Sequence, residues 1–447
     1  MTESKNNTEN AMNINNEVNT ATGINIDNGI NTANIMSTSN RKKSVAIFMV
    51  IVALSGLGLG LSDSVFSNYF RDAYDVYAFH RGLIEFPREL PGVITVLVVS
   101  VLAFMGNRKL AMLSHVLSVI GILVLGFWSP PFAIMLIFVF INSLGMHMFF
   151  PLYDSMAMSL AKDEGFGTAI GRFNGLRTGF TLAAGILVFV GFRSGFFTFT
   201  GPIVLNFIIA GVLFTVIFFL LMYLGRFMKD EKAEKSRFVF NKAYTKFYLL
   251  AILFGGRKQI MYVFGPWVLI ELLDFGADSM ALLMIVGAAI GIFFIPIVGK
   301  WIDKYGPAKI MIIETGLFLA IYIGYGLISA GLHGDWFTGV FAVIALTVGI
   351  NIVDRMTIQF GMVRSVYMRS VALTPDDVTP TLATGMALDH LVSIASAVFC
   401  GWLWVEVGPQ YVFVFSGVLA VLNMVVAVSI KRSAESKGEI AGEGADD

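Results

Sequence analysis

Ionisable side chains interrupt several long apolar stretches of this sequence, and their types are those that move protons or bind charged solutes. A charged residue inside a membrane-spanning helix costs at least about 2.5–3.5 kcal/mol on insertion scales unless it faces a cavity or a partner. If the stretches are membrane helices, these residues are therefore the first candidates for a functional site. They are Asp63, Glu85, Arg88, Glu89, His147, Asp154, Arg172, Arg177, Arg257, Lys258, Asp354, Arg355, Arg364, Asp389 and His390.

Among the deepest of these residues, basic side chains outnumber acidic ones. Guanidinium groups bind carboxylates and phosphates through paired hydrogen bonds, so we expect a polar solute that is anionic or zwitterionic. So many arginines would repel large hydrophobic cations. The candidate solute contacts are Arg88, His147, Arg177, Arg257, Lys258, Asp354, Arg355, Asp389 and His390.

Three carboxylates are candidates for carrying a coupling proton, because burial can bring the titration of a carboxylate towards neutral pH. They are Asp63, Glu89 and Asp389. Neighbouring arginines oppose this effect, so Asp63, which has no adjacent cation in its own stretch, is the clearest of the three.

A structural role is the alternative for each residue in these sets. Asp354 and Asp389 could simply neutralise arginines such as Arg257 and so lock helices together. His147 lies in a stretch rich in Met and Phe, where a histidine is more often a satisfied interior residue than a proton switch.

Glu85, Arg88 and Glu89 are spaced i, i+3 and i+4, which places them on one face of a helix. Pro87 and Pro91 bracket them, and they begin close to the expected outer surface. A local salt-bridge cluster or an outer gate fits this pattern as well as contact with a solute.

The composition requires lipid rather than water around most of the chain. Of 447 residues, 56% are hydrophobic and only 14% are charged, and the mean hydropathy is +0.76. A soluble domain carries about 25% charged residues. We therefore exclude an ordinary soluble enzyme. The 31 basic and 31 acidic residues cancel, so no global field attracts nucleic acid.

The segment 44–430 is long enough for twelve helices of about 20 apolar residues with short connections. We predict an all-α integral membrane protein on this basis. The expected spans are 44–69, 83–105, 110–128, 131–160, 166–191, 200–225, 245–271, 279–300, 308–330, 337–364, 379–404 and 409–430.

The basic residues predict the orientation, because cytoplasmic loops carry an excess of Lys and Arg. With an even number of helices both termini share a side, which holds most of the loop cations. The opposite side has only Arg71, Arg81 and Arg193. We therefore place both termini in the cytoplasm and the protein in the plasma (inner) membrane.

The polar segments divide the chain into parts. We expect a disordered cytoplasmic tail over 1–43, where the sequence is rich in Asn, Thr and Ser without helical periodicity. A basic linker over 226–244 separates two six-helix bundles, 44–225 and 245–430, as two packed repeats would require. A second cytoplasmic tail occupies 431–447.

One loop carries a motif. After the expected eighth helix the chain reads Gly299-Lys-Trp-Ile-Asp303-Lys304-Tyr-Gly306-Pro-Ala-Lys309. Its glycines allow a tight turn between helix ends, and Asp303 can accept backbone N–H groups or pair with a cation there. This resembles the G-x-x-x-D-[RK]-x-G-x-[RK] loop of the major facilitator superfamily, found after helix two and repeated in weaker form after helix eight.

Two departures from the superfamily pattern matter. The matching first-half loop, Gly106-Asn107-Arg108-Lys109, keeps the glycine and basic pair, but Ala103 occupies the place of the acid. The Gly-Pro pair common in helix five of drug–proton antiporters is also missing, which weakens a multidrug-efflux interpretation.

The resemblance implies two six-helix halves around a central cavity, with helices one, four, seven and ten lining it. In the superfamily, helices two, five, eight and eleven flank the cavity-lining helices. The charges that interrupt the apolar stretches lie in these two groups of helices, except that helix eight carries none in its middle. The resemblance also implies a gating role for the loop residues Gly299, Asp303, Lys304, Gly306 and Lys309.

We therefore predict a secondary active transporter, working by alternating access and driven by a proton or ion gradient. The alternatives are a proton-coupled efflux pump for amphiphilic compounds and a membrane receptor that binds a solute without moving it. The expected partners are a small-molecule solute, the bilayer and a coupling proton or cation, with the protein as a monomer.

Several signals are absent from the sequence. There is no G-x-x-x-x-G-K-[ST] loop for ATP, and no His, Cys and Asp set has structural metal spacing. Cys400 is the only cysteine, which excludes an internal disulfide. We accordingly expect no enzyme activity, no cofactor, no metal and no nucleic-acid partner.

Overall fold

A computed structural model describes residues 38–443 except for 129, 161–165, 231–239, 335, 338, 375 and 376. Within that part the regular structure is helical, and no strand is found. Residues 1–37 of the predicted tail over 1–43, the middle of the predicted linker and the last four residues lie outside the described residues.

Long helices alternate with short 3-10 or π turns, and the prediction of an all-α protein is confirmed. In the first part of the chain the elements are α2 (Thr38–Ser62), η2 (Asp63–Val65), α3 (Phe66–Tyr74), α4 (Ala78–Val101), η3 (Ala103–Met105), α5 (Asn107–Phe127), α6 (Phe132–Leu160), α7 (Phe166–Arg193) and α8 (Leu205–Leu224). In the second part they are η4 (Lys242–Tyr244), α9 (Thr245–Trp267), η5 (Val268–Leu272), α10 (Ala277–Tyr305), α11 (Pro307–His333), α12 (Val340–Thr357), η6 (Ile358–Met362), α13 (Val363–Val371), α14 (Val378–Glu406) and α15 (Pro409–Glu443).

Ten stretches of the described chain are helical, long and apolar enough to cross a membrane. They comprise α2 with α3, α5 to α8, α10, α11, α12 with α13, α14 and α15. The second and seventh predicted spans correspond to α4 and α9, which are also long helices but carry several ionisable side chains.

Several helices extend beyond their predicted limits. Helix α2 begins at Thr38, inside the expected tail, and α15 continues to Glu443 through most of the expected C-terminal tail. Helix α4 begins at Ala78, so Arg81, expected in an outer loop, lies within the helix and is fully buried. Arg81 therefore does not count as a loop cation.

Close packing of α4 against α14 depends on two small residues. A Cβ atom on Gly82 would collide with the carbonyl of Ala397, and one on Gly401 would lie 2.9 Å from the carbonyl oxygen of Ala78. Glycine at such crossings lets helix backbones approach closely. This contact joins an early helix to a late one and sets the position of the site.

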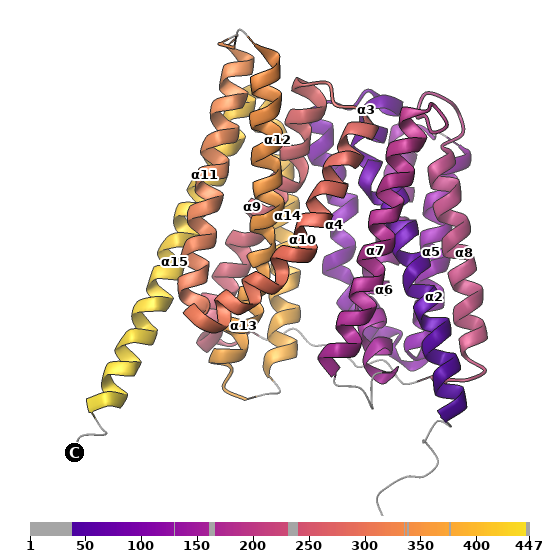
Figure 1. Cartoon of the computed structure of the whole chain (residues 1–447), viewed down its shortest axis with the longest axis horizontal. Helices are drawn as coiled ribbons and strands as arrows, with labels where there is room; N and C mark the ends of the chain where they lie inside the picture. The colour runs from indigo at the N-terminus through magenta and orange to yellow at the C-terminus, as the bar shows by residue number, and fades with distance from the viewer. Residues whose placement is uncertain are drawn as a thin grey trace, which may run out of the picture.

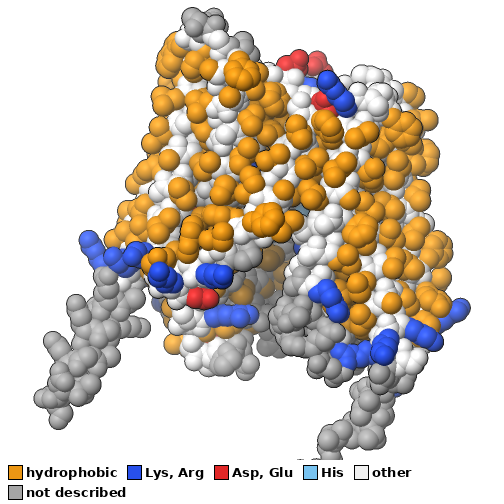
Figure 2. All heavy atoms as spheres, in the orientation of Figure 1, with side chains coloured by type: hydrophobic (Ala, Val, Ile, Leu, Met, Phe, Trp, Pro, Cys, Tyr) orange, Lys and Arg blue, Asp and Glu red, His pale blue; other side chains and the backbone are white. Residues whose placement is uncertain are grey.

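Figure 1 shows the start of α2 and the end of α15 at the same end of the molecule. We call the opposite end, where α2 ends and α4 begins, the distal end. Helices α7 and α10 approach each other near the distal end, where Gly185 faces Ile285, and diverge towards the other end. Figure 2 shows hydrophobic side chains over most of the visible flank, with Lys and Arg gathered near the end that carries the termini.

Candidate functional site

A polar cavity of about 200 Å³ lies between α2, α4, α6 and α9, close to the distal end of α2. Its polar lining includes Asp63, Arg88, Glu89, His147 and Tyr262. The first four were candidates from the sequence, where they stand in three separate apolar stretches. The fold therefore brings them to one place.

Arg88 is held by two carboxylates. Its Nη2 donates to Asp63 Oδ1 at 2.9 Å and its Nη1 donates to Glu85 Oε1 at 2.8 Å. The guanidinium also lies over the rings of Phe66 and Tyr262, 5.7 Å from each centroid. Asp63 has no adjacent cation in its own helical stretch, but α4 supplies one across the helix interface.

The network continues from α4 into α9. Glu85 is fully buried, pairs with Arg81 and accepts a hydrogen bond from Gln259 Nε2 at 2.6 Å. The hydroxyl of Tyr262 donates to Asp63 Oδ2 at 3.0 Å. These six residues, Asp63, Arg81, Glu85, Arg88, Gln259 and Tyr262, form what we call the distal network, which ties α2 and α4 to α9.

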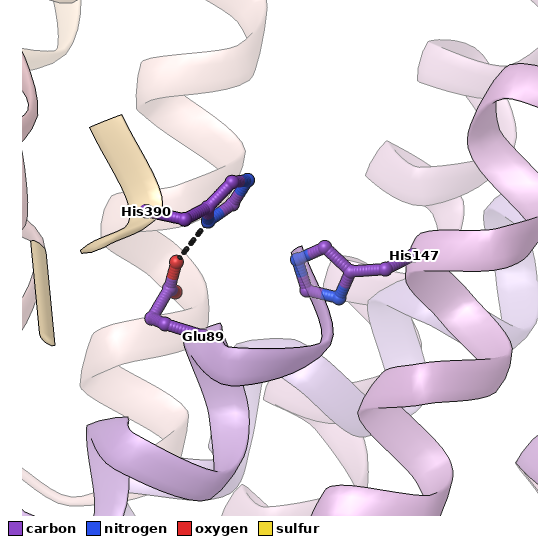
Figure 3. Close-up of side chains that lie close together, drawn as sticks. All are labelled: Glu89, His147 and His390. Atoms are coloured by element: carbon purple, nitrogen blue, oxygen red, sulfur yellow. Dashed lines mark hydrogen bonds and ion pairs between the residues drawn. The ribbon is translucent and has the colours of Figure 1, made fainter. Parts of the chain in front are cut away.

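Glu89, His147 and His390 form a second cluster beside the cavity, with contributions from α4, α6 and α14 (Figure 3). His390 Nδ1 donates to Glu89 Oε2 at 2.7 Å, and the two imidazole rings lie 5.2 Å apart between centroids. One potential ligand atom from each residue lies within 4.8 Å of those of the other two. We call this group the Glu–His cluster.

Lys258 and Asp389 form an ion pair between α9 and α14, with Lys258 Nζ 2.8 Å from Asp389 Oδ2. Both side chains keep some exposure, 24% and 17% respectively. The sequence suggested Arg257 as a partner for Asp389, but the next residue of the helix takes that position.

Arg257 lies in a different environment from its neighbour. Its side chain is fully buried and donates through Nη2 to Glu314 Oε1 at 3.1 Å. Arg364 Nη1 donates to the same oxygen at 3.1 Å. In this conformation the guanidinium of Arg257 is not available to a solute, because α11 and α13 enclose it. We call Arg257, Glu314 and Arg364 the buried triad.

The remaining candidates lie apart from one another. On α7, Arg177 is half-buried and lies over the rings of Tyr153 and Phe150, at 5.1 and 5.9 Å from their centroids. Phe150 also lines the polar cavity, so Arg177 lies next to it. On α12, Asp354 is buried and its neighbour Arg355 is half-buried.

A larger hollow of about 600 Å³ lies between α11 and α15, away from these residues. Its walls are mostly aliphatic and aromatic, and Leu327 and Val414 on them are more than half exposed. None of its lining residues is Asp, Glu, Lys, Arg or His. We interpret it as a groove on the lipid-facing surface and not as a solute site.

Comparison with known proteins assigns the chain to a family. The profile of the Major Facilitator Superfamily matches residues 48–374. The chain belongs to the major facilitator superfamily. No curated protein matches the sequence.

Solved structures share the fold of this major facilitator protein at low sequence identity. The nucleoside transporter NupG is 13% identical with a TM-score of 0.66, over 86% of this chain and 98% of that one. A POT family transporter in complex with a thioalcohol-conjugated peptide is 14% identical with a TM-score of 0.68, over 88% and 96%. A bacterial homologue of the iron transporter ferroportin is 13% identical with a TM-score of 0.65, over 87% and 98%.

The superfamily-like loop lies where α10 meets α11. Gly306 has φ of 78°, a conformation that glycine adopts without strain, and it joins the two helices with a single residue. Asp303, Lys304 and Lys309 are exposed there. Both lysines lie 5.1 Å from the centroid of the Tyr305 ring, so the turn presents a compact basic surface.

In the first-half loop, a carboxylate from another part of the chain lies where the motif's own acid is missing. The carboxylate of Asp230, which follows α8, accepts hydrogen bonds from the backbone N–H of Arg108 at 2.8 Å and of Lys109 at 3.2 Å. Gly106, with φ of 85°, leaves room for this carboxylate, because a Cβ there would lie 2.6 Å from its Cγ. Asp230 thus caps α5.

Replacing Asp230 with alanine should lower the free energy of unfolding by about 0.5–2 kcal/mol, the usual cost of losing a helix cap. Asp230→Asn should lose less stability than the alanine variant, because its amide oxygen can still accept from the N–H of Arg108, whereas the hydrogen bond from Lys109, which uses the other carboxylate oxygen, is lost. Hydrogen exchange at Arg108 and Lys109 is the direct measurement. Equal exchange rates in the alanine variant and the wild type would contradict the cap.

Sequence reasoning did not place Gln259, Tyr262 or Glu314 in the candidate site. A signal for the first two was present, since Gln259 and Tyr262 continue the polar face that begins with Lys258 in an otherwise apolar helix. Glu314 was visible as the only acid in its span, but nothing local identified its partners.

Proposed function

We propose that this major facilitator protein is a secondary transporter for a small polar solute, anionic or zwitterionic, and that it works by alternating access. The observation that carries the proposal is the polar cavity, which is lined by polar and charged residues from α4, α6, α9 and the end of α2, and is bounded towards the distal end by the distal network. A cavity with convergent polar groups in a transporter fold is the expected form of a solute site.

The proposed architecture has twelve spanning helices in two six-helix halves. Helices α4 and α9 complete the set because each is long and packs its charged residues against other helices. Lys and Arg near the end that carries the termini support a cytoplasmic location for both termini. We place the protein in the plasma membrane as a monomer.

The conformation supports an inward-facing state, closed at the distal end. Besides the distal network, Arg71 Nη1 donates to the carbonyl oxygen of Ile270 at 2.6 Å and Asn68 Nδ2 donates to that of Phe275 at 3.1 Å. These contacts join early helices to late ones near the proposed extracellular surface. Transport would require them to break when the cavity opens outward.

Arg177 is the proposed anchor for the negative group of the solute. Within the described part of the chain no carboxylate lies within ion-pairing distance of it, although Asp154 on α6 is close enough to interact with it electrostatically. The guanidinium lies over the rings of Tyr153 and of Phe150, which lines the cavity. A guanidinium without a protein carboxylate can pair with one from a solute. The POT family transporter that shares this fold is in complex with a thioalcohol-conjugated peptide, which agrees with a polar organic solute for this chain.

Coupling is proposed to use the carboxylates that hold hydrogen-bond donors across helix interfaces. Asp63 pairs with Arg88, Asp389 with Lys258, and Glu89 with His390. Protonation of a carboxylate would release its partner and loosen the contact between helices. Asp63 is the most accessible of the three, with its side chain 47% exposed.

Replacing Arg177 with glutamine should reduce uptake of an anionic or zwitterionic solute at least tenfold, because a charge-assisted bidentate contact is lost and hydrogen bonds to charged groups are worth about 1.5–3 kcal/mol. The measurement is flux into proteoliposomes over a panel of organic acids, amino acids, short peptides, nucleosides and cationic amphiphiles, with and without a pH gradient.

Arg432→Gln is the matched control, since it removes an exposed cation of α15 far from the cavity. Transport of cationic amphiphiles alone would support the efflux alternative and overturn the proposed solute class. Solute binding without flux would support the receptor alternative.

A further inference from the structure

We propose that the Glu–His cluster is a binding site for a divalent first-row transition-metal ion such as Zn²⁺, Co²⁺ or Fe²⁺, held by Glu89, His147 and His390. Two imidazoles and one carboxylate are a common ligand set for these ions and are poorly suited to Mg²⁺ or Ca²⁺. The three ligand atoms already lie within 4.8 Å of one another. Ligands on a tetrahedral zinc ion are about 3.3 Å apart, so side-chain rotations that move the ligand atoms by about 1–2 Å would complete the site.

The orientation of His147 matches that of a metal ligand. Its Nδ1 donates to the carbonyl oxygen of Ser143 at 2.9 Å, which leaves the lone pair of Nε2 free. Metal-binding histidines almost always donate their other N–H in this way, which fixes the tautomer and the ring orientation. Figure 3 shows this ring facing His390 and Glu89 from across the gap between α6 and the other two helices.

The position of the His390 ring is also fixed by its contacts with α4. The imidazole packs directly over Gly92 of α4, where a Cβ would lie 2.6 Å from three ring atoms. Glu89 stands one turn earlier on the same helix and holds Nδ1 at 2.7 Å. The glycine thus leaves room for the ring, and the carboxylate orients it.

The charge balance around the cluster favours a cation. Arg88, the nearest guanidinium in the sequence, is taken by Asp63 and Glu85, and Arg81 shares Glu85. These two cations and two carboxylates neutralise one another. Glu89 is left with His390 as its hydrogen-bond partner among the described residues, so a bound divalent ion would supply the positive charge that the site lacks.

Access and coordination also fit an exchangeable ion. Glu89 and His147 line the polar cavity, and all three side chains are only partly buried. Three protein ligands leave at least one coordination position, which water in the cavity would fill. A bound ion would connect α14 to α4 and α6, and so hold this conformation.

The test is metal binding by the purified full-length protein in detergent, which does not depend on transport activity. We expect one Co²⁺ per chain with the visible absorption bands of a low-symmetry nitrogen and oxygen site, and displacement by Zn²⁺ but not by Ca²⁺ or Mg²⁺. Zn²⁺ should also raise the melting temperature of the wild type, because a ligand that binds only the folded state stabilises it.

His147→Gln and His390→Gln should each weaken Zn²⁺ binding by more than 100-fold, beyond the 10–100-fold that loss of an outer hydrogen bond causes. Glu89→Gln keeps the shape of the side chain and should weaken binding without loss of folding. His333→Gln, on an exposed helix end, is the matched control. Wild-type affinity in the two cluster histidine variants, loss of binding in His333→Gln, or equal displacement by Ca²⁺ would overturn the proposal.

Discussion

Replacing Glu314 with glutamine is expected to lower the free energy of unfolding by about 3–5 kcal/mol, one of the largest losses available to a single substitution in this chain. The carboxylate of Glu314 is fully buried and forms ion pairs with both Arg257 and Arg364. The glutamine leaves two guanidinium charges in a medium that cannot solvate them. Thermal unfolding of the purified protein in detergent is the measurement.

Asp303→Asn is the matched control, because it removes an exposed acid near the end of α10. This substitution should leave the melting temperature unchanged. A combined apolar variant, Arg257→Leu with Glu314→Leu and Arg364→Met, should recover most of the lost stability, since buried ion clusters can be replaced by packed apolar groups. A wild-type melting temperature in Glu314→Gln would show that the buried triad does not hold the fold.

The apolar variant also separates the two roles considered for Arg257. If Arg257 only holds helices together, the stable apolar variant should transport as the wild type does. If it contacts the solute at another stage of the cycle, flux should be lost although the fold is intact. Flux and melting temperature measured on the same preparation distinguish these outcomes.

Replacing Gln259 with leucine is expected to raise the population that is open at the distal end by about 10–100-fold. Its amide donates to the buried carboxylate of Glu85, and a hydrogen bond to a charged group is worth about 1.5–3 kcal/mol. Because this bond joins α4 to α9, it exists only while the distal end is closed. Its loss therefore shifts the balance towards the outward-open state.

Distances between spin labels report this shift. Cys400 is the only cysteine, so a Cys400→Ala background accepts labels at Thr200 and His333, both exposed near the distal end. Ser67→Ala is the matched control, since its hydroxyl accepts from Arg81 between α3 and α4 and does not reach α9. An unchanged distance distribution in Gln259→Leu would contradict a closing role for the distal network.

Much of the fold could be predicted from the sequence because a bilayer imposes strong local rules. A spanning segment must be apolar, about 20 residues long and helical, and each of these properties can be recognised within a window of the chain. Ten of the predicted spans therefore correspond to helices that are long and apolar enough to cross a membrane, and α4 and α9 are helices at the positions of the other two. The Gly299–Lys309 motif was enough to indicate the superfamily, which the profile match then confirmed.

Boundaries were less predictable where helices carry charge. Arg81 appeared to lie outside the membrane because a buried arginine is costly unless it is paired. The structure pairs it with Glu85, one turn later on the same helix. The pairing makes burial possible, and it is decided by packing against other helices.

The sequence by itself determined which residues are ionisable at membrane depth, and therefore which residues any site must use. It could not determine their partners, because neighbouring residues point about 100° apart around a helix and the rotation of each helix is set by packing. Lys258 and Arg257 are adjacent, yet one meets Asp389 and the other Glu314. Glu89 and His390 are 301 residues apart in the sequence, and only the tertiary structure brings them together.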